Sequence, residues 1–301
     1  MDPVKFIILG NARTGSNLLV DQLKACPEVR VLGELFNLNS LKKVLQIRFL
    51  DNPLQYLEDQ LALAANDSIK TIGFKIFYYH ATTGQLLPGN YPDKNIEYAP
   101  PHLKKRINRL HDLLREKYNL EELGPKIQGV WAYLKNDPEL KVIHLKRKNK
   151  LATFLSLRRA FMTDEWTKPK GVKARAIKAI KDIPRKISGA GEINSGKSSR
   201  EPVYLSYEDC LEAFERSTAW EQEYDEFFKD HAKTDILYEN IKSDPRVEME
   251  KIYSLLGLEG EVELSDSLAK QNRKPLSESI ANYQELKNRF AQTPWQEFFI
   301  D

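Results

Sequence analysis

Short apolar runs alternate with longer amphipathic stretches along most of this chain. The runs, which predict strands, lie at residues 5–9, 29–32, 72–77, 142–145 and 235–237. Apolar residues recur at helical spacing between them, most clearly over residues 207–228 and 245–256. Strands separated by long helical stretches indicate a parallel β-sheet with helices on both faces. We therefore predict an α/β fold, and we expect ligands to bind at the carboxyl ends of its strands.

The first strand candidate ends in a turn flanked by glycines. The turn reads Gly10-Asn11-Ala12-Arg13-Thr14-Gly15-Ser16-Asn17, and apolar residues at helical spacing follow it. A strand, a tight loop and a helix in this order direct backbone N–H groups and the positive helix end at an anion. The Lys of NTP-hydrolysing loops is missing, however, and Arg13 is the cation that this loop carries. The central sheet is therefore P-loop-like, but the loop lacks the parts for ordinary ATP or GTP hydrolysis.

A second segment, residues 191–198, matches the G-x-x-x-x-G-K-[ST] pattern in full. This pattern has meaning only where a strand precedes it and a helix follows it. Here a basic stretch with Pro184 precedes it, and Pro202 comes four residues after it. We favour a loop tip rich in Gly and Ser. A P-loop kinase or NTPase that uses this segment is the alternative function.

Composition narrows the classes of protein. A chain of 301 residues can form one sizeable core, and we expect residues 1–301 to be a single domain. A net charge of +3 does not favour nucleic-acid binding. Cys26 and Cys210 have neither metal-binding nor redox spacing, so we expect reduced cysteines, a cytoplasmic location and no metal site. No run of 18 apolar residues occurs, so we expect no membrane span.

Residues 168–200 differ from the rest of the chain in charge. This segment holds ten Lys or Arg residues and two Asp or Glu residues, which gives a local net charge of +8. One interpretation is a solvated, mobile insertion. The other is a lid, or a basic patch for an anionic ligand or for peripheral contact with a membrane surface. The sequence leaves both open.

A second anion site is predicted in mid-chain. The strand candidate 142–145 ends in Lys146, Arg147 and Lys148, and Ser156 follows on the next predicted helix. A cationic strand end and a helical hydroxyl can hold a phosphate by charge-assisted hydrogen bonds. An ordinary basic surface turn is the alternative. Two anion sites at neighbouring strand ends suit a nucleotide that has phosphates on both sides of its ribose.

These motifs together resemble a known family. FIILGNARTGSNLL, residues 6–19, resembles the 5′-phosphosulfate loop of sulfotransferases that use 3′-phosphoadenosine 5′-phosphosulfate (PAPS). HLKRKNKLATFLSLRRA resembles the 3′-phosphate motif of that family. GELFN, residues 33–37, is similar to a segment of the bacterial carbohydrate branch, which includes the trehalose- and nodulation-factor-type enzymes. Segments 73–80 and 236–258 also resemble this branch, so the resemblance spans nearly the whole chain.

The resemblance implies a PAPS-dependent sulfotransferase that needs no metal and releases PAP, the 3′,5′-bisphosphate of adenosine. Its acceptor would be a hydroxyl of a sugar, a glycolipid or a related small metabolite, with no nucleic-acid partner. A homodimer is left open by the same resemblance. The donor-binding residues that it implies are Arg13, Thr14, Gly15, Ser16 and Asn17 at the 5′ end, and Arg147 and Ser156 at the 3′ end.

The 3′-phosphate motif departs from the family in one respect. Lys148 stands between Arg147 and Asn149, and no Pro follows, so either cation could be the main one. We favour Arg147, because a planar guanidinium can bind a phosphate through two hydrogen bonds. Arg273 and Lys274, before a proline, could close over the same phosphate or form an ordinary basic turn.

Four residues are candidates for the chemistry. By resemblance, Glu34 is the general base that takes the proton of the acceptor hydroxyl, and Arg13 supports the transferred group. His80 is the rival base, because the ordinary pKa of histidine lies near 6.5. Lys75 lies between Phe74 and Ile76 on a predicted strand, so it faces either the substrate and leaving group or a solvated side of the sheet.

Overall fold

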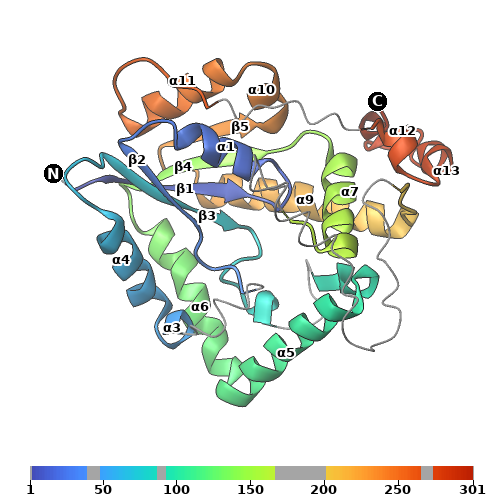
Figure 1. The fold of residues 1–301 in the computed structure, drawn as a ribbon, viewed down its shortest axis with the longest axis horizontal. Helices are drawn as coiled ribbons and strands as arrows, with labels where there is room; N and C mark the ends of the chain where they lie inside the picture. The colour runs from blue at the N-terminus through green and yellow to red at the C-terminus, as the bar shows by residue number, and fades with distance from the viewer. Residues whose placement is uncertain (1, 39–47, 87–92, 167–200, 266–273, 301) are drawn as a thin grey trace, which may run out of the picture.

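The computed structural model describes residues 2–38, 48–86, 93–166, 201–265 and 274–300. Five strands form one sheet in the order β2-β3-β1-β4-β5, and every neighbouring pair is parallel (Figure 1). The strands are β1 (Val4–Gly10), β2 (Val29–Glu34), β3 (Thr71–Phe77), β4 (Lys141–Lys146) and β5 (Lys233–Leu237). Each of the five predicted strands is therefore present.

Helices connect the strands. Between β1 and β4 lie α1 (Ser16–Leu23), α3 (Arg48–Asp51), α4 (Pro53–Ala64), α5 (Pro101–Lys117) and α6 (Leu120–Lys135), with the short 3₁₀ helices η1 (Thr83–Leu86) and η2 (Asp93–Tyr98). After β4 come α7 (Lys150–Thr163), α9 (Tyr207–Phe227), α10 (Tyr238–Ser243), α11 (Pro245–Leu256), α12 (Leu276–Ser279), α13 (Tyr283–Arg289) and η4 (Gln296–Phe298). The helices predicted over 207–228 and 245–256 correspond to α9 and α11.

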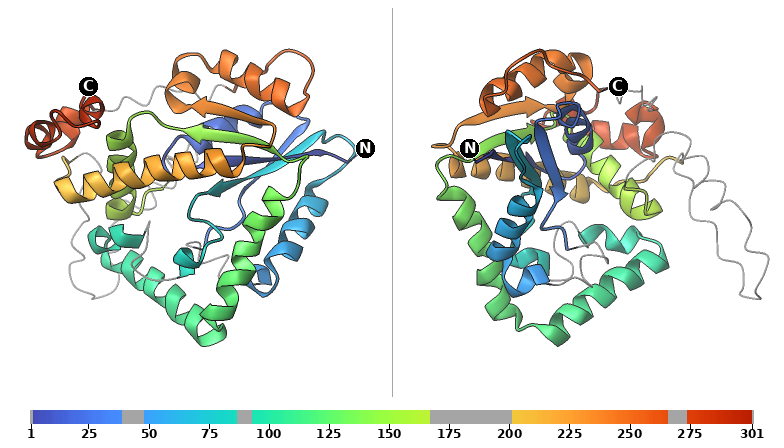
Figure 2. Two further views of the ribbon diagram at one scale, coloured as in Figure 1. Left: turned by 180° about the vertical axis from the view of Figure 1, so that it is seen from behind. Right: turned by 60° about the vertical axis from the view of Figure 1, so that its left-hand side comes forward.

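Both faces of the sheet are covered, which confirms the predicted fold class. Side chains of β1 alternate between two cores: Ile7 and Leu9 pack with residues of α4, α5, α6 and α9, whereas Phe6 and Ile8 pack with residues of α1, α10 and α11. Figure 2 shows α10 and α11 on one side of the sheet and α6 and α9 on the other. Burial on both faces explains why the strands read as continuous apolar runs.

The strand order places a switch point between β1 and β4. From β1 the chain first builds β2 and β3 on one side, and then crosses to build β4 and β5 on the other side. Loops that leave the carboxyl ends of strands at such a point diverge and make room for a ligand. The turns that follow β1 and β4 are the two predicted anion sites, so the topology brings them together.

No helix among the described residues is long and apolar enough to cross a membrane. The basic segment 168–200, the pattern at 191–198 and Arg273 lie outside the described residues.

Candidate active site

The turn after β1, residues 10–15, is called turn 1. Its backbone takes left-handed conformations at Arg13 (φ 67°) and Gly15 (φ 93°), directly before α1 begins. A Cβ atom built on Gly15 would lie 2.2 Å from the ring of Tyr238, so glycine is required by both conformation and space. The Thr14 hydroxyl donates to the Asn11 carbonyl over 2.7 Å and closes the turn. Turn 1 therefore has the tight shape expected of a loop that binds an anion.

The turn after β4, residues 146–150, is called turn 2, and it contacts turn 1 through Arg147. This guanidinium is buried, donates from Nη1 to the Arg13 carbonyl over 3.1 Å and stacks 4.7 Å from the centre of the Tyr238 ring. Lys148 is exposed, and its backbone N–H donates to Glu239 over 3.0 Å. Of the two cations that the sequence left open, Arg147 is the one in contact with turn 1.

Arg13 points from turn 1 toward α7 and the segment that follows it. Its Nε donates to the Ser156 hydroxyl over 3.0 Å, and its Nη1 donates to the Trp166 carbonyl over 2.5 Å. Ser156, which the resemblance assigns to the other phosphate, is thus a direct neighbour of Arg13. The structure brings the residues of both predicted anion sites into one contiguous cluster.

Glu34 lies at the carboxyl end of β2, opposite Lys75 of β3. The pairing of the two strands shifts register between Val31 and Glu34, and Gly33 has φ 82°, so the carboxylate turns toward Lys75. Lys75 Nζ donates to Glu34 Oε1 over 2.9 Å and to Asn17 Oδ1 over 2.7 Å. Lys75 is buried, so its ammonium faces the site and not a solvated side of the sheet.

The contacts of Glu34 decide its charge. Burial raises the pKa of its carboxyl, but the Lys75 ammonium, the electrostatic effect of His80 and the hydrogen bonds from Lys75 and Asn37 together outweigh burial and hold the pKa below its ordinary value. Asn37 Nδ2 donates to the second oxygen over 2.5 Å. The carboxylate is therefore ionised near neutral pH and held in one orientation.

His80 follows β3 and is fully buried. Its Nδ1 accepts a hydrogen bond from the Phe77 backbone N–H over 3.2 Å, and its own carbonyl accepts from Trp131 Nε1 over 2.9 Å. Since Nδ1 uses its lone pair in this contact, the neutral ring assigned from the geometry carries its proton on Nε2. In this arrangement His80 is a hydrogen-bond donor.

The remaining predicted residues lie in two places. Ser16 and Asn17 open α1, where Ser16 is buried and Asn17 accepts from Lys75. Lys274 is exposed and precedes α12, and its carbonyl accepts from the Ser279 hydroxyl over 3.4 Å.

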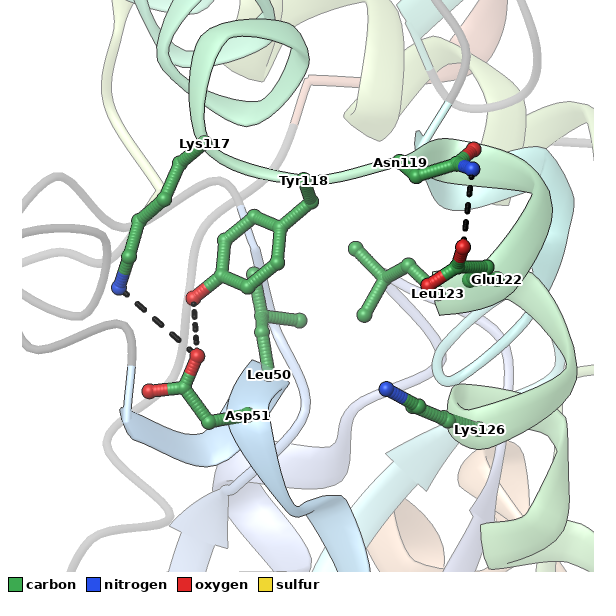
Figure 3. Close-up of a pocket in the computed structure, with 8 residues that line it drawn as sticks. All are labelled: Leu50, Asp51, Lys117, Tyr118, Asn119, Glu122, Leu123 and Lys126. Carbon is green, nitrogen blue, oxygen red and sulfur yellow. Dashed lines mark hydrogen bonds and ion pairs between the residues drawn. The ribbon is translucent and has the colours of Figure 1, made fainter.

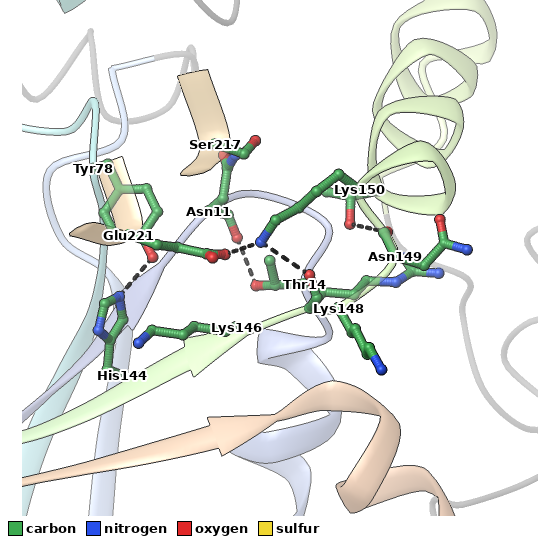
Figure 4. Close-up of polar contacts among 12 residues, drawn as sticks. Asn11, Thr14, Tyr78, His144, Lys146, Lys148, Asn149, Lys150, Ser217 and Glu221 are labelled. Atoms are coloured by element: carbon green, nitrogen blue, oxygen red, sulfur yellow. Dashed lines mark hydrogen bonds and ion pairs between the residues drawn. The ribbon is translucent and has the colours of Figure 1, made fainter. Parts of the chain in front are cut away.

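Sequence analysis missed a group of polar residues behind the two turns. Asn11, Lys150, Ser217 and Glu221 interact there, and Figure 4 shows them between turn 1, turn 2 and α9. Ser217 and Glu221 are polar residues four positions apart within a predicted helix, and this spacing was the available signal. Their partners, however, lie far away in the sequence.

One cluster among the described residues has ligand types that bind metals. His144, Asp225 and Asp235 bring ligand atoms within 4.8 Å of one another. Lys146 already lies 2.7 Å from Asp225 and 3.0 Å from Asp235, and the Tyr78 hydroxyl lies 2.6 Å from His144 Nε2. Lys233 also lies 2.6 Å from Asp225, so two ammonium groups neutralise the two carboxylates that a metal ion would need. The cluster therefore has the chemistry of an ion-pair network.

A cavity of about 330 Å³ lies between α3 and the α5–α6 turn (Figure 3). Its lining mixes charges of both signs: Asp51 lies 3.8 Å from Lys117, and Glu122 and Lys126 also line the cavity. No residue of the predicted site lines it. The two turns that are predicted to bind anions define the candidate active site, and this cavity is separate from it.

Two relatives match the chain in sequence. Nodulation protein H of Rhizobium meliloti strain 1021 is 23% identical over 301 residues, which cover 99% of this chain and 96% of the relative. A second Nodulation protein H of Rhizobium meliloti is 24% identical over 236 residues, which cover 72% of this chain and 84% of the relative. No family model matches the chain. The similarity to the first relative spans nearly the whole chain and agrees with the resemblance to sulfotransferases of the nodulation type.

Two solved structures match the chain at low similarity. A sulfotransferase from Alicyclobacillus acidocaldarius has a TM-score of 0.41 and 14% identity, and the match covers 97% of this chain and 92% of that chain. The sulfotransferase domain of the Synechococcus PCC 7002 olefin synthase has a TM-score of 0.37 and 13% identity, with coverages of 94% and 83%.

Proposed function

We propose that this sulfotransferase moves the sulfuryl group of PAPS to a hydroxyl of a sugar, a glycolipid or a related small metabolite. The observation that carries the proposal is the contact between the two anion-binding turns, in which Arg147 of turn 2 donates to the Arg13 carbonyl of turn 1. A donor with phosphates on both sides of its ribose needs two such sites side by side at neighbouring strand ends.

In this proposal the donor lies across the two turns. The 5′-phosphosulfate is bound by the N–H groups of turn 1, the side chains of Arg13 and Thr14, and the start of α1 with Gly15, Ser16 and Asn17. Arg147 and Ser156 bind the 3′-phosphate, with Arg147 in place of Lys148 as the main cation because it is the one that contacts turn 1. Arg273 and Lys274 could add charge at the same end.

The reaction is an in-line displacement at sulfur. The acceptor oxygen forms a bond to sulfur, the bond from sulfur to the bridging oxygen breaks, and PAP leaves with that electron pair. Catalysis then depends on positioning and on positive charge near the leaving oxygen, as in phosphoryl transfer. Arg13 and Lys75 supply that charge, since Lys75 reaches Asn17 in the first turn of α1.

Glu34 is the proposed general base. Its pKa is lowered, so it is ionised and able to accept the proton of the acceptor hydroxyl. The rival, His80, has Nδ1 occupied by the Phe77 backbone N–H, which leaves it a donor role toward the acceptor. Glu34 therefore fits the role of base better.

Calorimetric titration with PAP and transfer of radiolabelled sulfate from PAPS to a panel of sugars and glycolipids test the proposal. Arg13→Ala and Arg147→Ala should weaken PAP binding at least about tenfold, whereas Arg289→Ala on the surface of α13 should not. A wild-type protein that binds no PAP would refute the proposal. If Lys197→Ala abolishes nucleotide binding while Arg13→Ala is harmless, the NTPase alternative takes its place.

A further inference from the structure

One face of α9 runs behind both anion-binding turns. Ser217, Glu221 and Asp225 follow one another at four-residue spacing, which places them on the same side of the helix. Figure 2 shows α9 lying along the sheet, and Figure 4 shows Ser217 and Glu221 directed at the turns. We call these three residues the α9 ridge.

The first residue of the ridge holds turn 1. The Asn11 amide donates from Nδ2 to the Ser217 hydroxyl over 3.2 Å, and both side chains are buried. The same Asn11 accepts from the Ala12 N–H over 2.8 Å through its amide oxygen, and its carbonyl accepts from the Thr14 hydroxyl. Ser217 therefore fixes the residue on which the shape of turn 1 depends.

The second residue of the ridge holds turn 2. Glu221 pairs with Lys150, a buried lysine at the start of α7. Lys150 Nζ also donates to the Arg147 carbonyl over 3.1 Å, so the ion pair fixes the backbone that carries the Arg147 guanidinium. The third residue, Asp225, binds Lys146 at the end of β4 over 2.7 Å and thus anchors the strand that leads into turn 2.

The buried ion pair between Glu221 and Lys150 has an unfavourable desolvation free energy, so a contribution to stability alone does not explain it. Burial raises the pKa of Glu221 above its ordinary value, against the opposing effect of Lys150, so the charged pair is desolvated. Buried ion pairs of this kind add little net stability compared with apolar residues of the same size. What the pair does provide is a fixed position for two backbone segments that come from different parts of the sheet.

We infer that Ser217 and Glu221 are positioning residues that set the spacing between turn 1 and turn 2 and thereby determine the affinity for the bisphosphate donor. The inference rests on the proposed function, because it takes the two turns to be the two ends of one donor site. Neither side chain touches the donor in this arrangement; each acts through Asn11 or through Lys150 and Arg147. A single helix, α9, thus contacts both turns from behind.

Glu221→Gln, Ser217→Ala and the wild-type protein, titrated with PAP, test this inference. Asp209→Asn is the matched control, because Asp209 also lies on α9 and binds the buried Arg158 over 2.8 Å, but Arg158 contacts Asn95 and neither turn. Melting temperatures are recorded for all variants. A second probe is 5′-AMP, which lacks the 3′-phosphate.

Glu221→Gln should weaken PAP binding about tenfold, whereas Asp209→Asn should change it less than about twofold at a similar loss of melting temperature. Glu221→Asp, which retains the carboxylate, should recover most of the affinity. Glu221 acts on turn 2, which is proposed to bind the 3′-phosphate that 5′-AMP lacks. Glu221→Gln should therefore lower the affinity for 5′-AMP less than the affinity for PAP. Ser217→Ala acts on turn 1 and should lower the affinity for both ligands to the same extent.

Equal effects of Glu221→Gln and Asp209→Asn on PAP binding would overturn the inference and leave the proposed function intact. The same holds if Glu221→Gln weakens PAP and 5′-AMP equally. A wild-type protein that binds no PAP would overturn both.

Discussion

The ammonium group of Lys75 lies 2.9 Å from Oε1 of Glu34. The two residues come from adjacent strands, and the register shift before Glu34 is what makes them neighbours. Lys75 also holds Asn17 at the start of α1, so one buried cation joins the proposed base to the proposed sulfate-binding helix. In the proposed function, this pair links the acceptor side of the site to its donor side.

The ion pair between Glu34 and Lys75 should determine the pH at which activity is lost on the acid side of the pH–rate profile. Because the pKa of Glu34 lies below its ordinary value, the proposed base should stay ionised to a lower pH than an ordinary glutamate would, and the acid limb should lie correspondingly low. Lys75→Met removes the largest of the effects that lower this pKa and leaves the effect of burial, so the acid limb should move to higher pH. The measurement is kcat as a function of pH with saturating PAPS.

The control for this prediction is Lys70→Met, which removes a half-exposed lysine that pairs with Glu28 near the amino ends of the strands. This variant should leave the acid limb in place. An unshifted limb in Lys75→Met would mean that a group other than Glu34 is the base. The same pair contributes to stability above the ordinary pKa of Glu, and this contribution is lost as the pH falls through the lowered pKa.

Activity should depend on the planar shape of the Arg13 guanidinium as well as on its charge. Arg13→Ala removes the guanidinium that the proposed function assigns to the transferred group, and it should lower kcat about 10²- to 10³-fold. Arg13→Lys keeps the charge but cannot reach both Ser156 and the Trp166 carbonyl, so its kcat should fall between the alanine variant and the wild type. Steady-state kinetics with PAPS measures this. Full activity of Arg13→Lys would show that charge alone suffices.

Gly15 should tolerate no side chain. Gly15→Ala adds a Cβ at 2.2 Å from the Tyr238 ring and forces alanine into φ 93°, so the variant should lose both stability and PAP binding. Gly257→Ala is the matched control, since Gly257 also has positive φ (66°) but has open space where the Cβ would lie. Thermal melts should show a much larger loss for Gly15→Ala; equal losses would mean that the contact with Tyr238 relaxes freely.

The sheet was predictable because its strands are apolar on both faces. Residues 5–9 and 142–145 read as buried strands, and the switch point that they create fixes where the two basic turns meet. The alternation of side chains along a strand did not decide whether Lys75 faces the site or a solvated side of the sheet. An inference from alternation assumes one wet face, whereas β3 is a central strand with both faces buried, so the lysine points into the polar end of the sheet.

The ridge of α9 could not be predicted from the sequence. Ser217 meets Asn11 across 206 positions, and Glu221 meets Lys150 across 71 positions, so no local pattern links the partners. Helical spacing places Ser217 and Glu221 on one face, but it does not tell whether that face meets solvent or a turn. Only the packing of α9 against the sheet decides this.

His144 should make stability depend on pH in the mildly acidic range. The ring is fully buried, and burial together with the Lys146 ammonium lowers its pKa to about 4, against the opposite pull of Asp225 and Asp235. In the unfolded chain histidine titrates near pH 6.5, so the unfolded state binds one proton more between pH 6.5 and 4. As the pH is lowered from 6.5 to 4, the free energy of unfolding should therefore decrease, and His144 should contribute up to about 3 kcal/mol to this decrease.

The variant His144→Gln removes this proton uptake, so its free energy of unfolding should depend less on pH between 6.5 and 4 than that of the wild type. Urea denaturation at a series of pH values measures the difference in slope between the two proteins. His102→Gln, at a mostly exposed histidine of α5, is the control and should keep the wild-type slope. Parallel curves for the wild type and His144→Gln would contradict a neutral buried ring, because they would require the Asp225 and Asp235 carboxylates to keep His144 charged in the folded state.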